Sequence, residues 1–148
     1  MPTATYEIDT HFHLDEIKAV LIDFRNYPQF LSNIEHVEVQ LDNSPIWEVR
    51  FVLQLIRRMQ YELRLQLDDY PDHSVLHWSL LEGVFQSNTG RWKLTPTEDG
   101  TTISYTISIT LETRLPHTIS KSLIRISMPN VVQEVLEEVE KRKKNISS

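Results

Sequence analysis

Two neighbouring histidines have the residue type and the spacing that metal sites use. His11 and His13 are two positions apart, so their side chains share one face if the strand that contains them continues. A bound zinc ion needs three or four ligands, and no third ligand can be identified in the sequence. We therefore predict no metal site.

Three aspartates, Asp68, Asp69 and Asp72, cluster beside the predicted turn Tyr70-Pro71-Asp72-His73. A calcium loop places a glycine at its sharp turn and a glutamate at its end, and this segment has neither. We interpret the cluster as a solvated acidic turn.

Catalytic chemistry has few candidates in this sequence. We find no nucleophile beside a base, no paired carboxylates and no glycine-rich phosphate loop, and the chain has no cysteine. His77 and Arg50 are the groups that could supply one acid or base to a reaction that works by holding its substrate in shape. His77 lies in a strand that is apolar on both faces, so it could face a cavity, but we interpret it as structural or solvent-facing. We predict no catalytic residue and no cofactor, and we favour a role without catalysis.

Composition places the chain among ordinary globular proteins. It has 148 residues, of which 40% are hydrophobic and 24% charged, with a net charge of −6. This is enough chain to bury one core, and we predict a single domain over residues 1–148. The acidic balance makes nucleic acid a poor partner.

Location is predicted from what the sequence lacks. We expect neither a signal peptide nor a membrane span, because no charged segment leads into an apolar one and the apolar runs are short. Together with the missing cysteines, this favours the cytoplasm.

The elements that position these residues follow from hydrophobic periodicity. Alternation predicts a strand from Thr3 to His11, and a helical period then predicts a short amphipathic helix that ends near Asp23. A second short helix is expected at Tyr27-Pro28-Gln29-Phe30-Leu31, where Pro28 suits a first turn.

From His36 the period is two, which predicts a meander of antiparallel strands. The predicted strands are Val37–Leu41, Trp47–Leu55, Met59–Asp68, Val75–Glu82, Phe85–Pro96 and Thr101–Leu111. The apolar face of such a sheet has to be covered. A helix from Ile119 to Lys144 is the candidate cover, with a kink, a break or a new start expected at Pro129.

Several segments resemble the START-like superfamily, also called SRPBCC or Bet v 1-like. They are Tyr27-Pro28-Gln29-Phe30-Leu31, Val37-Glu38-Val39, Glu82-Gly83-Val84-Phe85, Gly90-Arg91-Trp92-Lys93-Leu94 with Pro96, and Gly100-Thr101-Thr102. Within it they are similar to the polyketide cyclase/dehydrase and lipid transport branch, which includes coenzyme Q-binding proteins and ribosome-associated toxins. The resemblance extends from about Thr3 to Lys144, although each motif alone is weak.

The resemblance implies an α+β helix-grip fold. In that fold a curved antiparallel sheet of about seven strands carries two short helices after its first strand, and a long C-terminal helix packs across it. It also implies an apolar cavity between sheet and helix for a lipid, quinone or polyketide-like ligand. The ligand itself varies within the superfamily, so the fold leaves its identity open.

Residues on the inward faces are the candidate ligand-binding residues. A filled core is the alternative interpretation of the same residues. Tyr61, Tyr105 and Trp92 carry polar tips that could orient a quinone or hydroxylated ring. The full candidate set is Trp47, Phe51, Tyr61, Leu63, Leu65, Trp78, Phe85, Trp92, Tyr105, Ile107, Met128 and Val132.

Three functions remain open at this point. The first is binding or transport of a small hydrophobic ligand, with room for transient contact with a membrane. The second is a ribosome-associated, toxin-like interaction module, for which Arg57, Arg58, Arg64 and Arg91 could form a local basic patch despite the net charge of −6. The third is a polyketide cyclase or aromatase.

Overall fold

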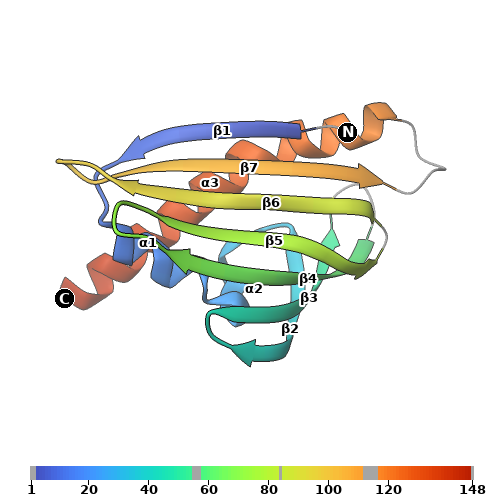
Figure 1. Ribbon diagram of the computed structural model, residues 1–148, viewed down its shortest axis with the longest axis horizontal. Coiled ribbons are helices and arrows are strands. Elements are labelled where there is room, and N and C mark those ends of the chain that lie inside the picture. The colour runs from blue at the N-terminus through green and yellow to red at the C-terminus, as the bar shows by residue number, and fades with distance from the viewer. Residues whose placement is uncertain (1–2, 55–57, 84, 112–116, 148) are drawn as a thin grey trace.

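The seven strands form one antiparallel sheet in a computed structural model that describes residues 3–54, 58–83, 85–111 and 117–147. The strand order is β1-β7-β6-β5-β4-β3-β2, so β1 is carried to the far edge and pairs with β7 (Figure 1). The elements are β1 (Thr3–Thr10), α1 (Leu14–Leu21), η1 (Phe24–Asn26), α2 (Tyr27–Phe30), β2 (Ile34–Asn43), β3 (Ile46–Gln54), β4 (Arg58–Asp69), β5 (Ser74–Gly83), β6 (Phe85–Pro96), β7 (Thr101–Leu111) and α3 (His117–Ser147).

The strands agree with the alternation in the sequence, and the α+β helix-grip prediction is confirmed. β6 and β7 have the predicted bounds, and the others differ by a few residues at their ends. Leu55, the predicted end of β3, lies outside the described residues. The ambiguous strand β5 is resolved: Leu76 and Trp78 are buried, whereas His77 between them is half-exposed on the other face.

The first strand stops before the two histidines. β1 ends at Thr10, and His13 is the residue that caps α1, where its backbone N–H donates to the Glu16 carboxylate over 2.9 Å. His11 and His13 therefore do not share a strand face. Among the described residues, no three metal-ligating side chains come together.

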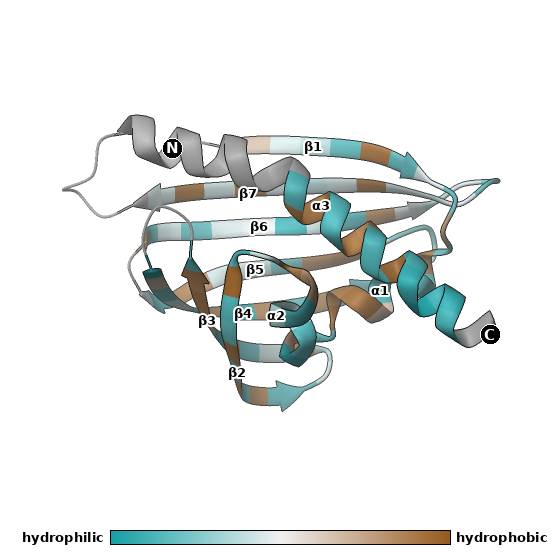
Figure 2. Cartoon of the chain, turned by 180° about the vertical axis from the view of Figure 1, so that it is seen from behind, coloured by the Kyte–Doolittle hydropathy of each residue, from teal (hydrophilic) through white to brown (hydrophobic). Residues whose placement is uncertain are grey.

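The long helix α3 covers the inner face of the sheet. It crosses the sheet diagonally, and its outward side is largely hydrophilic (Figure 2). Val132, Val135 and Val139 are almost fully buried on the opposite side of the helix. The helix runs from His117 to Ser147, so the break or new start predicted at Pro129 does not occur. A proline removes one backbone hydrogen bond, and this helix has 31 residues over which the remaining bonds continue.

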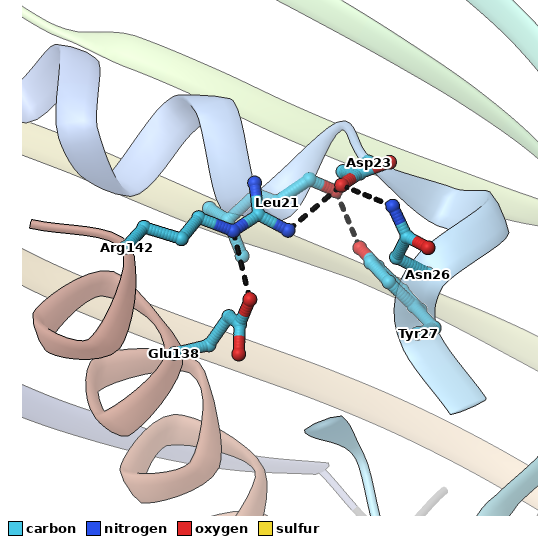
Figure 3. Close-up of polar contacts among 6 residues, drawn as sticks. All are labelled: Leu21, Asp23, Asn26, Tyr27, Glu138 and Arg142. Atoms are coloured by element: carbon cyan, nitrogen blue, oxygen red, sulfur yellow. Dashed lines mark hydrogen bonds and ion pairs between the residues drawn. The ribbon is translucent and has the colours of Figure 1, made fainter. Parts of the chain in front are cut away.

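A polar network fastens α3 to the segment after α1 (Figure 3). Arg142 donates from Nη2 to Asp23 Oδ2 over 2.7 Å and from Nε to Glu138 Oε2 over 2.8 Å. Asn26 donates to the same Asp23 oxygen. Further along the helix, Glu134 accepts a hydrogen bond from the backbone N–H of Ser32. The helix is thus held at two points against the elements that close one end of the sheet.

None of the described helices is both long and apolar enough to cross a lipid bilayer.

Gly100 allows the β6–β7 turn to approach the end of β1. A Cβ at this position would lie 2.0 Å from the carbonyl oxygen of Thr10, which is a backbone atom and cannot rotate away. The next residue, Thr101, is fully buried and donates from its hydroxyl to the carbonyl of Phe12. The close approach therefore joins β7 to the β1–α1 connection.

We predict that Gly100→Ala lowers the free energy of unfolding by about 1–3 kcal/mol, because the added methyl group forces the two backbone segments apart. Urea unfolding monitored by tryptophan fluorescence measures the change. Asp99→Ala, at an exposed position of the same turn, is the control and should stay within about 0.5 kcal/mol of the parent. Equal stability of the two variants would contradict the prediction.

Candidate ligand-binding site

A cavity of about 140 Å³ lies between the inner face of the sheet and α3. Strands β3 to β7 form its floor, α3 contributes one wall, and α2 with the start of β2 closes another. Its lining is mainly apolar and aromatic. The lining residues are Tyr27, Leu31, Asn33, Ile34, Phe51, Leu53, Tyr61, Leu63, Leu65, Leu76, Trp78, Phe85, Asn88, Trp92, Tyr105, Ile107, Ile109, Val131, Glu134 and Val135.

Most of the residues selected from the sequence come together around this cavity. They arrive from five different strands, because each strand directs alternate residues to the inner face. The members of the candidate set that line the cavity are Phe51, Tyr61, Leu63, Leu65, Trp78, Phe85, Trp92, Tyr105 and Ile107.

Two candidates are buried beside the cavity without lining it. The Trp47 ring packs against Phe24 at 5.3 Å between centroids, and its Nε1 donates to Asp42. Val132 follows Val131 on α3, so its side chain points about 100° further round the helix. The third, Met128, lies outside the residues whose side chains are described.

Other lining residues were not among the sequence candidates. Leu31, Asn33 and Glu134 come from a loop and a helix flank that periodicity does not mark as inward. Asn88 is different, because it shares the inward phase of β6 with Gly90 and Trp92 and is only 4% exposed. A polar residue in an inward position of a strand was a signal that could have identified it.

Aromatic rings form two connected groups on the cavity floor. Phe51 stacks on Tyr61 at 5.4 Å, and Tyr61 meets Phe85 edge-on at 5.0 Å. Trp92 lies 4.3 Å from Tyr105. Contacts of this kind fix the rings in place, so the cavity has a defined shape.

Buried tyrosine hydroxyls give the apolar cavity a polar component. Tyr27 donates to the carbonyl of Leu21, whereas Tyr61 and Tyr105 have no hydrogen-bond partner for their hydroxyls among the described residues. Burial raises the pKa of Tyr61 and of Tyr105 well above the ordinary value, and the nearby Tyr105 phenol raises the pKa of Tyr61 further. Both phenols therefore stay protonated and can donate to a ligand.

The two residues considered for acid or base chemistry do not line the cavity. His77 faces the outer side of the sheet, where its Nε2 lies 2.8 Å from Asp68 Oδ2, which agrees with the structural interpretation. Arg50 is also on the outer side, 3.9 Å from Glu38. Both are separated from the cavity by the sheet itself.

The aspartate cluster is more engaged than a solvated turn. Hydrogen bonds from Gln66 and then His77 lower the pKa of Asp68. Asp69 accepts from the Ser74 hydroxyl over 2.6 Å and pairs with Lys18 on α1, and its pKa is lowered chiefly by Ser74. The cluster therefore links the β4–β5 turn to α1, away from the cavity.

A curved antiparallel sheet that grips one long helix over an aromatic cavity defines a helix-grip protein of the START-like superfamily. The profile described as "Polyketide cyclase / dehydrase and lipid transport" matches residues 14–136, and the chain belongs to that family. A comparison with curated proteins gave no match.

Solved structures of low sequence identity share this fold. A START superfamily protein from Mycobacterium smegmatis has 15% identity and a TM-score of 0.77, with 94% of this chain and 97% of that chain covered. The Zhui aromatase/cyclase from Streptomyces sp. R1128 has 17% identity and a TM-score of 0.79, covering 95% and 94%. Human StAR-related lipid transfer protein 5 has 14% identity and a TM-score of 0.82, covering 95% and 76%.

The buried phenols predict a loss of stability in alkali. Their pKa is raised in the folded protein, so the stability they contribute is complete below the ordinary tyrosine pKa of 10.0 and is lost as the pH rises above it. Above that pH each such group should cost about 1.4 kcal/mol per pH unit until it ionises in the folded protein. We expect Tyr105→Phe and Tyr61→Phe each to unfold less steeply with pH between pH 10 and pH 11.

Urea unfolding at a series of pH values measures this slope. Each variant is its own reference at pH 8, where the hydroxyl is protonated in both the folded and the unfolded chain. An unchanged alkaline slope in both variants would show that these two phenols do not govern the transition.

Proposed function

We propose that this protein binds a small hydrophobic ligand in the cavity between its sheet and α3, as a carrier or sensor. The observation that carries the proposal is an apolar, aromatic cavity whose buried hydroxyls have no partner among the described residues. Binding sites for small molecules combine apolar walls with a few such polar groups. The family description, which includes lipid transport, supports the same role.

Cavity size limits what can be enclosed. A volume of about 140 Å³ is close to that of an engineered protein cavity of about 150 Å³ that holds benzene. One ring fits inside without any rearrangement. A lipid, quinone or polyketide-like ligand would place one ring or chain segment in the cavity and the rest at its half-exposed rim, where Asn33, Ile34, Val131 and Glu134 lie.

Catalysis and ribosome binding have less support. Among the described lining residues the only carboxylate is Glu134, and it already accepts the Ser32 N–H. Of the arginines that could form a basic patch, Arg57 lies outside the described residues, Arg58 pairs with Glu35 at 3.0 Å, and Arg64 lies opposite Glu48. Binding of coenzyme Q, transient membrane contact and a cytoplasmic location stay predictions.

Native mass spectrometry of the purified protein, followed by solvent extraction, tests the proposal directly. We expect a reproducible apolar adduct. Apo protein should also take up a solvatochromic dye, and a ligand at a concentration one hundred times its Kd should add about 2.7 kcal/mol to the free energy of unfolding. A clean apo mass together with no stabilisation by any lipid, quinone or dye would overturn it.

Filling the cavity should abolish binding. In Leu65→Trp the larger side chain occupies the space that a ligand would take, so dye affinity should fall at least about tenfold, while the melting temperature stays near that of the parent. Arg64→Trp, on the exposed outer face of the same strand, is the matched control and should bind normally. Normal dye binding by Leu65→Trp would place the dye elsewhere.

A further inference from the structure

Asn88 is a buried carboxamide in a cavity wall that is otherwise mostly apolar. It is 4% exposed, and it lies on β6 opposite Ile109 of β7. Its only hydrogen bond within the described residues joins it to Trp78, whose Nε1 lies 3.1 Å from Oδ1. An indole nitrogen can only donate, so the atom that it contacts must be the amide oxygen.

That contact determines which half of the amide remains. With the oxygen occupied by Trp78, the Nδ2 amine has two hydrogens and no partner among the described residues. Burying such a group without a hydrogen bond is unfavourable. Because Asn88 lines the cavity, the cavity is the direction from which a partner can reach it.

Gly90 is the residue that lets Trp78 hold Asn88 in this orientation. Trp78 on β5 pairs with Gly90 on β6, and a Cβ at Gly90 would lie 2.3 Å from the indole Cζ2. The missing side chain allows the indole to lie across β6. From there its Nε1 reaches Asn88, two positions earlier on the same face of the strand.

The unpaired groups define the complementary chemistry of a ligand. The amine of Asn88 and the hydroxyls of Tyr61 and Tyr105 all donate hydrogen bonds, so they suit an oxygen that accepts. No lysine, arginine or histidine occurs among the described lining residues, and Glu134 contributes the only charge. A carboxylate would therefore be desolvated here without a cation to pair with it.

We propose that Asn88, oriented by Trp78 and Gly90, donates from Nδ2 to a neutral carbonyl oxygen on a ring-sized part of the ligand. This selects ring ketones and related neutral carbonyl compounds over hydrocarbons and carboxylates of the same size. The inference rests on the proposed function, since it assigns a ligand class to the same cavity.

Three probes of one shape test this assignment. Acetophenone carries the carbonyl, α-methylstyrene replaces its oxygen with a CH2 group, and benzoate carries a carboxylate. Kd values are measured for the parent and for Asn88→Leu. We expect Asn88→Leu to weaken acetophenone about fivefold, the size of one neutral hydrogen bond, and to leave α-methylstyrene unchanged or tighter. Benzoate should bind most weakly to the parent.

Ser74→Ala is the matched control for loss of a buried polar group. Ser74 is also 4% exposed, but its hydroxyl bonds to Asp69 away from the cavity. This variant should keep the parent ratio of acetophenone to α-methylstyrene affinity. A general loosening of the fold would change both variants alike.

A measurement on the parent protein covers the case in which Asn88→Leu fails to fold. In a ¹H–¹⁵N spectrum, the side-chain NH2 resonances of Asn88 should shift with acetophenone and stay in place with α-methylstyrene. If both probes bind and neither these resonances nor the affinity ratio responds, the role of Asn88 is wrong while cavity binding stands. Benzoate binding more tightly than acetophenone would also overturn it. If no probe perturbs the cavity residues, the proposed function fails and the inference fails with it.

Discussion

One helix has to cover the whole inner face of a seven-stranded curved sheet, and the rest of the structure follows from that constraint. An apolar sheet face cannot be left to water, and α3 is the element that lies across it. A single straight helix contacts a curved surface along one line only. Val132, Val135 and Val139 pack along that line, and the space to one side remains as the cavity. The cavity is therefore a geometric consequence of the fold, and the side chains decide what it can hold.

The position of the helix is held by polar contacts at its C-terminal half. Arg142 joins Asp23 and Glu138, while Glu134 reaches the backbone of Ser32. Because η1 and α2 follow Asp23 directly, the same network positions Tyr27, which is one wall of the cavity. Exposed ion pairs add little stability one by one, so we interpret the network as setting where the helix lies.

Buried polar groups distinguish this cavity from an ordinary core. A core is normally free of unpaired donors, because each one carries a desolvation penalty. Here the Tyr61 and Tyr105 hydroxyls and the Asn88 amine face one another's neighbourhood without partners among the described residues, whereas Tyr27 and Trp78 are satisfied. The contrast lies within a single cavity wall. It is the pattern expected where a ligand or ordered water completes the hydrogen bonds.

The sequence by itself determined the elements and the inner face, because a period of two or of 3.6 residues records which side of a strand or helix is apolar. It did not separate Trp47 from Phe51, which share the inner face of β3 although only Phe51 lines the cavity. Nor did it indicate that α3 continues through Pro129, or that Trp78 reaches Asn88 across Gly90. Those outcomes depend on the curvature of the sheet and the path of the helix over it. Both are set by contacts between residues far apart in the chain, which a local period cannot encode.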